Sequence, residues 1–385
     1  MPTVELGADP CRLLGLVASP SLFHPRTEEG SPNVDAESPT AGAPQISVVV
    51  CTLNGAKRIE KCLAAVRRQS LGEGLQLIVV DDGSTDNSAE VAATYGAEVI
   101  RHAANRGLAA ARNTGIAAAV APIIATLDDD CEPDPEWAER LLSGFVEGVV
   151  GVGGPAIPAS IEGYFGGYLE RNNPLAPLEI DLASNTHVTY RFARYLLRNA
   201  RPAPSGGRAV HAFATANGAF RADVLRQLGG FDERFRSDEG GEDLDLCLRI
   251  GDGHARGALR FEPSAILRHH FDTSPRALLR RCRSYGRGAA RLYCKRRNMP
   301  PTVFPFPLLV AGLLAWSRGR ASRLTAALVL PQLLFSNGCR NALRQHSPAP
   351  LLDCYVKLAE EAGLNIGFAV GLWRCRDRQT VDTAT

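Results

Sequence analysis

The 385-residue chain lacks the sequence features that define several protein classes. Its ten cysteines form no C-x-x-C pair and no close cysteine–histidine cluster, which excludes a zinc ribbon and a haem-attachment motif. Apolar residues are 45% and charged residues 22%, which excludes a disordered tail, a fibrous repeat and a multi-span membrane protein. No charged segment followed by an apolar run and a cleavage site opens the chain. We therefore expect free thiols in a reducing cytosol, and a soluble or membrane-edge cytoplasmic protein.

Acidic residues are absent from residues 273–352, although this segment carries fourteen arginines and lysines. Since the net charge of the whole chain is +2, the remainder carries a net charge of −12. Segregation of this kind favours a basic surface that binds an anionic partner, while the acidic remainder of the chain has a different function.

Strand and helix patterns alternate from residue 46 onward. The preceding residues 1–44 are rich in Pro, Ser, Glu and Ala without a sustained period, and they predict a flexible leader. The predicted strands are 46–51, 75–80, 97–100 and 122–127, and the predicted helices are 58–68, 88–94 and 108–120. The alternation implies βαβ units in a parallel, doubly wound sheet, whose ligands bind outside the carboxyl ends of the strands.

After residue 127 the alternation loosens. The predicted helices are 135–146, 223–228 and 244–250, and the strand-like segments are 149–157, 212–220 and 259–267. Residues 158–209 show no clear period, so the sequence predicts no regular element there.

Three acidic groups follow predicted strands or a glycine pair. Asp82 belongs to a D-D-G-S segment, which is typical of an ordinary turn. The alternative is that its carboxylate accepts hydrogen bonds from a base or ribose. Asp128, Asp129 and Asp130 repel one another, which a divalent cation such as Mg²⁺ or Mn²⁺ would relieve; a solvated acidic loop is the alternative. The third group, E-D at 242–243, fits a general base or ordinary first-turn acids of a helix.

Taken in order along the chain, these groups make the sequence resemble family 2 glycosyltransferases, which adopt the nucleotide-sugar-binding GT-A fold. The matching motifs are I-S-V-V-V-C-T-L-N-G (46–55), V-V-D-D-G-S-T-D (79–86), N-R-G-L-A-A-A-R-N-T-G-I (105–116), T-L-D-D-D-C-E-P-D-P-E-W (126–137), A-N-G-A-F-R (216–221), G-G-F-D-E-R-F (229–235), G-G-E-D-L-D-L-C-L-R (240–249) and S-Y-G-R-G (284–288). The resemblance implies a GT-A-type, mostly parallel sheet flanked by helices, with a helical, partly amphipathic C-terminal extension. It also implies a catalytic domain at 45–272, divided into a nucleotide-sugar-binding half (45–157) and an acceptor-binding half (158–272).

The resemblance suggests roles for the residues that bind the donor. Thr52 and Asp82 would contact the nucleotide base, Asn54 would shape that pocket, and Arg112 would approach the donor. Cys51 departs from the family, in which proline is frequent at this position. The difference falls at the edge of the donor pocket and is not expected to affect the reaction.

A D-x-D pair and a histidine would hold the metal. By resemblance, Asp128 would meet the ribose and Asp130 the Mg²⁺ or Mn²⁺, and Asp129 between them is the alternative for either role. His269 matches a position near the metal or diphosphate; the neighbouring His270 makes this assignment ambiguous, and a solvated histidine pair is the alternative.

The family's catalytic base would be Asp243, preceded by Glu242. The resemblance points to a single displacement that inverts the anomeric configuration. It involves a nucleotide-diphosphate sugar, UDP-linked by family habit, and a hydroxyl acceptor that the sequence does not identify. One alternative is a sugar-nucleotide-forming nucleotidyltransferase, for which residues 52–57 form too short and glycine-poor a phosphate loop. Another is a catalytically silent relative that binds a lipid or protein.

The predicted C-terminal region, 273–385, begins with a basic helix over 276–297. Arg276, Arg280, Arg283, Arg287 and Arg291 form one stripe and apolar residues the opposite face, which favours contact with anionic headgroups at the inner face of the cell membrane. The alternative is a helix packed on the catalytic domain, weakened by glycines at 286 and 288.

The rest of this region contains two short apolar segments, 303–316 and 324–335. Both fall short of the ~20 residues that span a bilayer, so they predict an interfacial or re-entrant hairpin. Residues 351–373 are expected to pack back onto the domain, and no recognisable module supports a nucleic-acid role.

Overall fold

The computed structural model describes residues 43–178, 206–296, 299, 301–317, 319–334 and 337–382. The predicted leader, 1–44, lies outside the described residues except for its last two positions. Residues 179–205 also lie outside the described residues, and they include much of the segment that we expected to shape the acceptor site.

A mixed sheet of eight strands forms the centre of the described chain, in the order β3-β2-β1-β4-β9-β6-β10-β8. Its strands are β1 (Ile46–Thr52), β2 (Leu75–Asp81), β3 (Glu98–Arg101), β4 (Ile123–Asp128), β6 (Gly151–Gly153), β8 (Arg208–Ala209), β9 (Asn217–Arg221) and β10 (Leu259–Phe261). Strands β1 to β4 pair in parallel, β9 runs antiparallel to both β4 and β6, and β8 runs antiparallel to β10. Thr52 pairs with Asp81 and Cys51 with Asp128, so the carboxyl ends of the three central strands lie level with one another.

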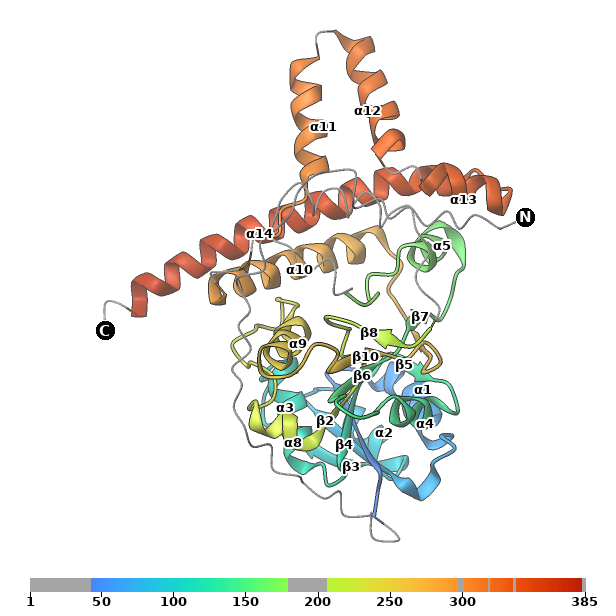
Figure 1. Ribbon diagram of the computed structural model, residues 1–385, viewed down its shortest axis with the longest axis vertical. Helices are drawn as coiled ribbons and strands as arrows, with labels where there is room; N and C mark the ends of the chain where they lie inside the picture. The colour runs from blue at the N-terminus through green and yellow to red at the C-terminus, as the bar shows by residue number, and fades with distance from the viewer. Residues whose placement is uncertain are drawn as a thin grey trace, which may run out of the picture. The chain divides into compact units, whose positions relative to one another are not determined.

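Helices cover both faces of this sheet, as the βαβ pattern predicts (Figure 1). Side chains of β1 alternate between two cores because successive residues of a strand point to opposite faces. Ile46, Val48 and Val50 pack with α1 (Ala56–Arg67), α2 (Ser88–Thr94) and α4 (Trp137–Ser143). The residues between them, Val49 and Cys51, pack with α3 (Leu108–Ala118), α8 (Ala222–Gln227) and α9 (Glu242–Gly253).

A second, smaller sheet combines β5 (Cys131–Pro133), β11 (Leu267–His269) and β7 (Ala156–Pro158). It corrects two predictions, because the segments 149–157 and 259–267 each divide between the two sheets instead of forming one strand. The break at Gly154 allows close backbone approach, since a Cβ there would lie 2.1 Å from the carbonyl oxygen of Ala265. The predicted strand 212–220 is likewise shorter and begins at Asn217.

Two long helices dominate the C-terminal part: α10 (Pro275–Lys295) and α14 (Asp353–Asp382), which pack along each other (Figure 1). Gly363, Gly367 and Gly371 line one stripe of α14, where added Cβ atoms would meet α10 at 3.2, 2.3 and 2.6 Å. Residues 351–373 were expected to pack back onto the domain; α14 packs mainly on α10, and its Asp353 and Glu360 also contact Arg171 and Tyr168. The remaining described α-helices are α5 (Gly163–Arg171), α11 (Pro305–Trp316), α12 (Arg320–Leu334) and α13 (Asn337–Gln345).

The glycines of α10 do not interrupt it, contrary to the expectation that they weaken the helix. A Cβ on Gly288 would lie 1.3 Å from the carbonyl oxygen of Gly240, and one on Gly286 would lie 2.2 Å from that of Leu364. Glycine at these two positions lets α10 approach both the loop before α9 and the helix α14. Their propensity cost is offset by this packing.

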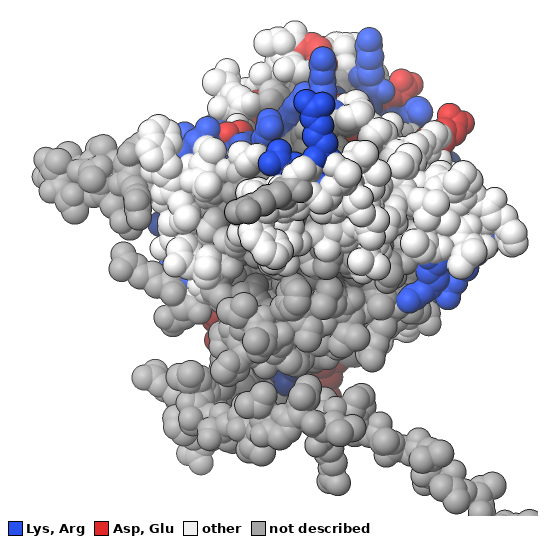
Figure 2. Space-filling view, turned by 90° about the horizontal axis from the view of Figure 1, so that it is seen from above, with Lys and Arg blue, Asp and Glu red and all other residues white. Residues whose placement is uncertain are grey.

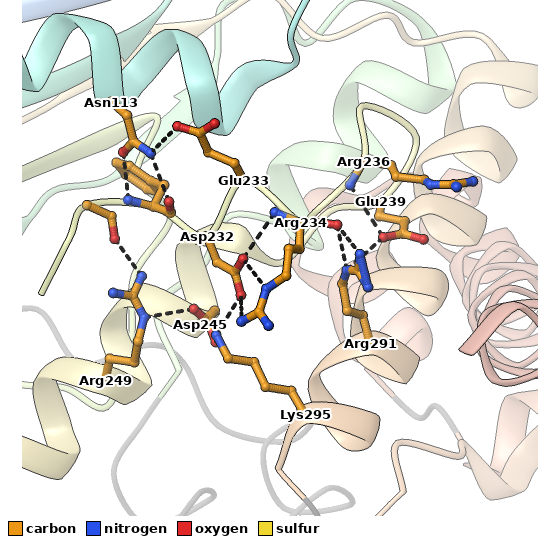
Figure 3. A network of polar contacts seen from close by, with 12 residues as sticks. Asn113, Asp232, Glu233, Arg234, Arg236, Glu239, Asp245, Arg249, Arg291 and Lys295 are labelled. Carbon is orange, nitrogen blue, oxygen red and sulfur yellow. Dashed lines mark hydrogen bonds and ion pairs between the residues drawn. The ribbon is translucent and has the colours of Figure 1, made fainter. Parts of the chain in front are cut away.

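The second half of the basic stripe on α10 packs against the loop 232–239 and α9 (Figure 3). Arg287 and Arg291 lie 3.3 and 3.1 Å from carboxylate oxygens of Asp238 and Glu239. Lys295 Nζ lies 2.7 Å from carboxylate oxygens of both Asp232 and Asp245. This part of the helix follows the alternative interpretation, a surface helix held on the domain. No helix among the described residues has the length and apolar character needed to cross a membrane.

Candidate functional site

Asp82 follows β2 and is engaged by the segment that leads into α3. Its carboxylate accepts hydrogen bonds from the backbone N–H groups of Arg106 and Gly107, at 2.9 and 2.8 Å. His102 Nδ1 also lies 2.7 Å from Asp82 Oδ1. Gly107 has a φ of 97°, a conformation that glycine adopts without strain, so the chain turns sharply here into α3. The structure thus shows Asp82 holding this turn, and its contact with a base stays a prediction.

Thr52 ends β1 and Asn54 lies in the loop after it, next to the loops that follow β2 and β4. Thr52 Oγ1 donates to Asp129 Oδ2 at 2.7 Å, and Arg58 holds the same carboxylate through Nε and Nη2. Asn54 has a φ of 50°, and its Oδ1 accepts from the N–H and hydroxyl of Thr85. These contacts fix the loops at the carboxyl edge of the sheet. They also occupy Asp129, the middle aspartate of the triplet.

Arg112 links two of the acidic groups, which lie more than a hundred positions apart in the sequence. This buried residue of α3 lies with Nη2 3.0 Å from Asp128 Oδ1 and with Nη1 2.9 Å from Glu242 Oε1. Its guanidinium also stacks over the ring of Phe231, 5.1 Å from the centroid. The carboxyl end of β4 and the start of α9 are therefore joined by one cation.

A cavity of about 240 Å³ opens beside this bridge. Arg112, Asp128, Glu242 and Asp243 line it together, as does Tyr285 from α10. The predicted base, the acid before it and two of the predicted donor residues thus share one space. The other lining residues that carry polar side chains are Thr215, Arg236, Ser237, Glu239 and Ser284.

The cavity environment favours the protonated form of Asp243. Burial and the neighbouring Glu242 raise the pKa of Asp243 to about 7, whereas the charge of Arg112 opposes that rise. A carboxyl group with a pKa near neutrality is suited to exchange protons at physiological pH. Asp243 lies in the first turn of α9, directly after Gly241, whose φ of 110° again requires a glycine-like backbone.

Asp130, Cys131 and His269 form a candidate metal site in the described residues. Each offers one ligand atom, and these atoms lie within 4.8 Å of one another. Pairing of β5 with β11 sets Cys131 directly opposite His269. His269 Nε2 lies 3.6 Å from Asp130 Oδ1, so two of the three residues predicted as metal ligands do meet. Asp128 is outside this group and engages Arg112 instead.

The chemistry of these side chains fits a divalent cation. Burial and repulsion by Asp128 and Asp129 raise the pKa of Asp130 to about 7, and an added cation would relieve that repulsion. Burial lowers the pKa of His269 to about 4, so the imidazole is neutral and its lone pair is available. Its Nδ1 is buried without a hydrogen-bond partner among the described residues. His270 is engaged elsewhere, by Glu132, which distinguishes the two histidines.

Several site residues were not singled out from the sequence. Cys131 follows the aspartate triplet directly, and this adjacency was the one local signal for it. Arg58 and Phe231 support Asp129 and Arg112 from distant segments, and the sequence shows nothing of those contacts. Tyr285 lies in a family-like motif, but its place in the cavity depends on how α10 packs.

Residues 47–229 match the sequence model described as Glycosyl transferase family 2. The chain belongs to this family. It is 32% identical over 315 residues to the pre-mycofactocin glycosyltransferase of Mycobacterium tuberculosis (strain H37Rv), a match that covers 81% of this chain and 57% of the relative. The chain thus spans less than two thirds of that protein's length. It is also 29% identical over 235 residues to the validoxylamine A glucosyltransferase of Streptomyces hygroscopicus subsp. jinggangensis (strain 5008), covering 57% of this chain and 53% of that protein.

A solved structure supports the fold of this family 2 member. The mannosyltransferase PcManGT from Pyrobaculum calidifontis, solved with GDP-Man and Mn²⁺, superposes with a TM-score of 0.52 at 19% identity. The match covers 87% of this chain and 88% of PcManGT. The predicted GT-A-type architecture, a large mostly parallel sheet flanked by helices with a helical C-terminal region, is confirmed.

Proposed function

We propose that this protein is an inverting glycosyltransferase that moves a sugar from a nucleotide-diphosphate donor to a hydroxyl acceptor. The observation that carries the proposal is the shared cavity, in which Asp243 lies beside the cation Arg112 and the carboxylate of Asp128. A proton acceptor and a binding surface for an anionic donor are thus combined in one space at the carboxyl edge of a GT-A-type sheet. Family membership and the names of the relatives support the reaction class.

Donor binding is assigned to the strand ends. Thr52, Asn54 and Asp82 would form the base pocket, Arg112 would approach the donor, and Asp128 would meet the ribose. PcManGT was solved with a nucleotide-diphosphate sugar and Mn²⁺, which supports this class of donor. We propose uracil as the base, following the habit of the family.

Asp130 and His269 would hold Mg²⁺ or Mn²⁺, with Cys131 as a third donor atom beside them. A divalent cation bound there would supply positive charge for the departing nucleotide diphosphate. Asp129 would not be a direct ligand, because Thr52 and Arg58 already engage its carboxylate.

Asp243 would act as the general base of a single displacement. The acceptor hydroxyl forms a bond to the anomeric carbon and gives its proton to the Asp243 carboxylate. The bond from that carbon to the diphosphate oxygen breaks, and the nucleotide diphosphate leaves with the electron pair. Attack from the face opposite the leaving group inverts the anomeric configuration. Glu242 would support the base indirectly, by holding Arg112 next to it.

We further propose that the protein works at the inner face of the cell membrane. Of the basic stripe over 276–297, Arg287 and Arg291 are paired with domain carboxylates. Arg276, Arg280 and Arg283 are exposed on α10 and are the members of the stripe that would face anionic headgroups.

Calorimetric titration tests the donor and metal assignments. UDP, GDP and dTDP are titrated with and without Mn²⁺ into the wild-type chain, into Asp130→Ala and into a control variant, Glu147→Gln, at an exposed site. We expect one nucleotide to bind in a Mn²⁺-dependent manner, with that dependence lost in Asp130→Ala and kept in Glu147→Gln. A folded wild-type sample that binds none of the three would instead favour a catalytically silent relative.

A further inference from the structure

The helices α11 and α12 form a pair whose outward side is apolar. They contact each other and follow each other in the chain across residues 317–319 (Figure 1). The sequence of α11 contains no charged residue, and the charges of α12 are confined to Arg320 and Arg323 in its first turn. We call the two helices α11 and α12 the hairpin.

Large apolar side chains on the hairpin are exposed to solvent. Trp316 is 82% exposed, Leu333 71%, Leu324 63% and Leu308 60%. Leu309 and Leu328 are exposed as well. Contiguous apolar surface of this kind is rare on proteins that have no partner there, and it marks an interaction site.

The charges around the hairpin identify the partner. The hairpin lies within the eighty residues that contain no acidic side chain, and Arg320 and Arg323 are exposed at the start of α12. In the space-filling view, Lys and Arg side chains gather beside a broad uncharged surface (Figure 2). If a second copy bound to this surface, its arginines would lie close to the same arginines of the first copy. The like charges would repel one another, and this segment has no carboxylate to offset them. Anionic headgroups over an acyl layer match both the charge and the apolar surface.

The dimensions of the hairpin set the mode of contact. At ~1.5 Å per residue, helices of 12 and 15 residues are about 18 and 23 Å long, shorter than the ~30 Å hydrocarbon core. The arginines at the turn resist transfer to the bilayer centre. A hairpin lying in the headgroup region keeps these arginines near phosphates and its leucines at the acyl boundary.

We propose that the hairpin docks this protein in the interface of a lipid bilayer that carries anionic headgroups. The proposal deepens the peripheral location proposed above and rests on it, but it moves the main contact from α10 to the hairpin. The reason is that part of the positive charge of α10 is already paired within the protein. Lys295 pairs with Asp245, and Arg296, which follows the helix, pairs with Asp252.

Vesicle co-sedimentation of the full chain tests the assignment. The vesicles are phosphatidylcholine alone, or phosphatidylcholine with phosphatidylglycerol. One variant combines Leu308→Ser, Trp316→Ser and Leu324→Ser, and a matched control combines Val120→Ser and Ile161→Ser, which are 70% and 56% exposed outside the hairpin. We expect the hairpin variant to lose at least tenfold in affinity for phosphatidylglycerol vesicles, and the control to bind like the wild type.

Charge variants separate the hairpin from α10. Arg320→Gln with Arg323→Gln should weaken binding to the anionic vesicles by roughly 25-fold, about fivefold for each arginine. Arg276→Gln with Arg280→Gln should weaken binding less than that. The proposal would be overturned if the hairpin variants bound anionic vesicles like the wild type and the α10 variant did not bind. The peripheral location would then remain intact.

Two further readouts keep the outcomes distinct. Mn²⁺-dependent nucleotide titration of the hairpin variant, without vesicles, should match the wild type, which shows that the catalytic domain is folded. If the wild-type chain bound to neither kind of vesicle, both the proposal and the peripheral location would be overturned. If the hairpin changes abolished a dimer seen in sedimentation of the wild type, a second copy would cover this surface, and the proposal would be overturned while the peripheral location through α10 stayed intact.

Discussion

Arg112 and Glu242 lie 130 positions apart in the sequence, and their side chains meet with 2.9 Å between Nη1 and Oε1. The same guanidinium holds Asp128 with its other terminal nitrogen. One buried cation therefore balances the acids at the end of β4 and at the start of α9. It also lowers the pKa of the neighbouring Asp243, opposing the effect of burial.

Arg112→Gln is expected to move the pH dependence of transfer upward. The loss of the cation raises the pKa of Asp243 above its present value of about 7, so the unprotonated base forms only at higher pH. The variant should also be destabilised by about 3 kcal/mol, because Glu242 is left without its partner. A pH–rate profile and a denaturant titration measure both effects, with Arg68→Gln at an exposed position as the control. An unchanged pH midpoint in the folded variant would contradict the electrostatic role.

In Asp243→Asn we expect donor binding to persist and transfer to fall by roughly 100-fold or more, because the amide does not accept the acceptor's proton. The wild-type rate should rise with pH and level off above a midpoint of about 7, since the raised pKa keeps Asp243 protonated, and inactive as a base, at lower pH. Steady-state rates and calorimetry with the same donor separate these effects. If the variant lost donor affinity as much as turnover, Asp243 would be a binding residue and not the base.

The two histidines should respond differently to substitution. We expect His269→Ala to weaken Mn²⁺ binding by roughly 10-fold or more, since it belongs to the candidate site with Asp130. His270→Ala is the matched control and should leave Mn²⁺ affinity unchanged, because that imidazole engages Glu132. Titration of Mn²⁺ followed by electron paramagnetic resonance measures both. Equal losses in the two variants would remove the distinction that the structure draws.

Gly288→Ala is expected to destabilise the protein by more than about 2 kcal/mol. The added Cβ would lie 1.3 Å from the carbonyl oxygen of Gly240, so α10 or the loop before Asp243 must shift. Gly251→Ala in α9 meets no atom within 4 Å and should stabilise its helix by about 0.5 kcal/mol. Denaturant unfolding of both variants checks this pair, and similar stabilities for the two would contradict the close packing of α10.

The sequence predicted the strands and helices between residues 46 and 127 well because their signals are local. The helix at 88–94 appears with the predicted bounds, and the strand at 46–51 extends by one residue. Its alternation with helices fixes a parallel order and brings Asp82 and Asp128 to one edge. The position of Asp243 also followed a local signal, the glycine pair before it.

What the sequence did not predict depends on long-range pairing. Cys131 lies opposite His269 because two three-residue strands pair across more than a hundred positions, and strands that short carry no periodic signal. The glycines of α10 look like helix breakers until the backbone of Gly240 lies against them. The basic stripe likewise divides into paired and exposed halves only when the carboxylates of the loop 232–239 are in place.

A crystal structure with Mn²⁺ and the nucleoside diphosphate that binds best would test the central claim most directly. The account predicts an anomalous Mn²⁺ peak between Asp130 and His269, and a nucleotide that reaches the cavity between Arg112 and Asp243. A nucleotide bound away from this cavity, or a Mn²⁺ peak remote from Asp130, would contradict it.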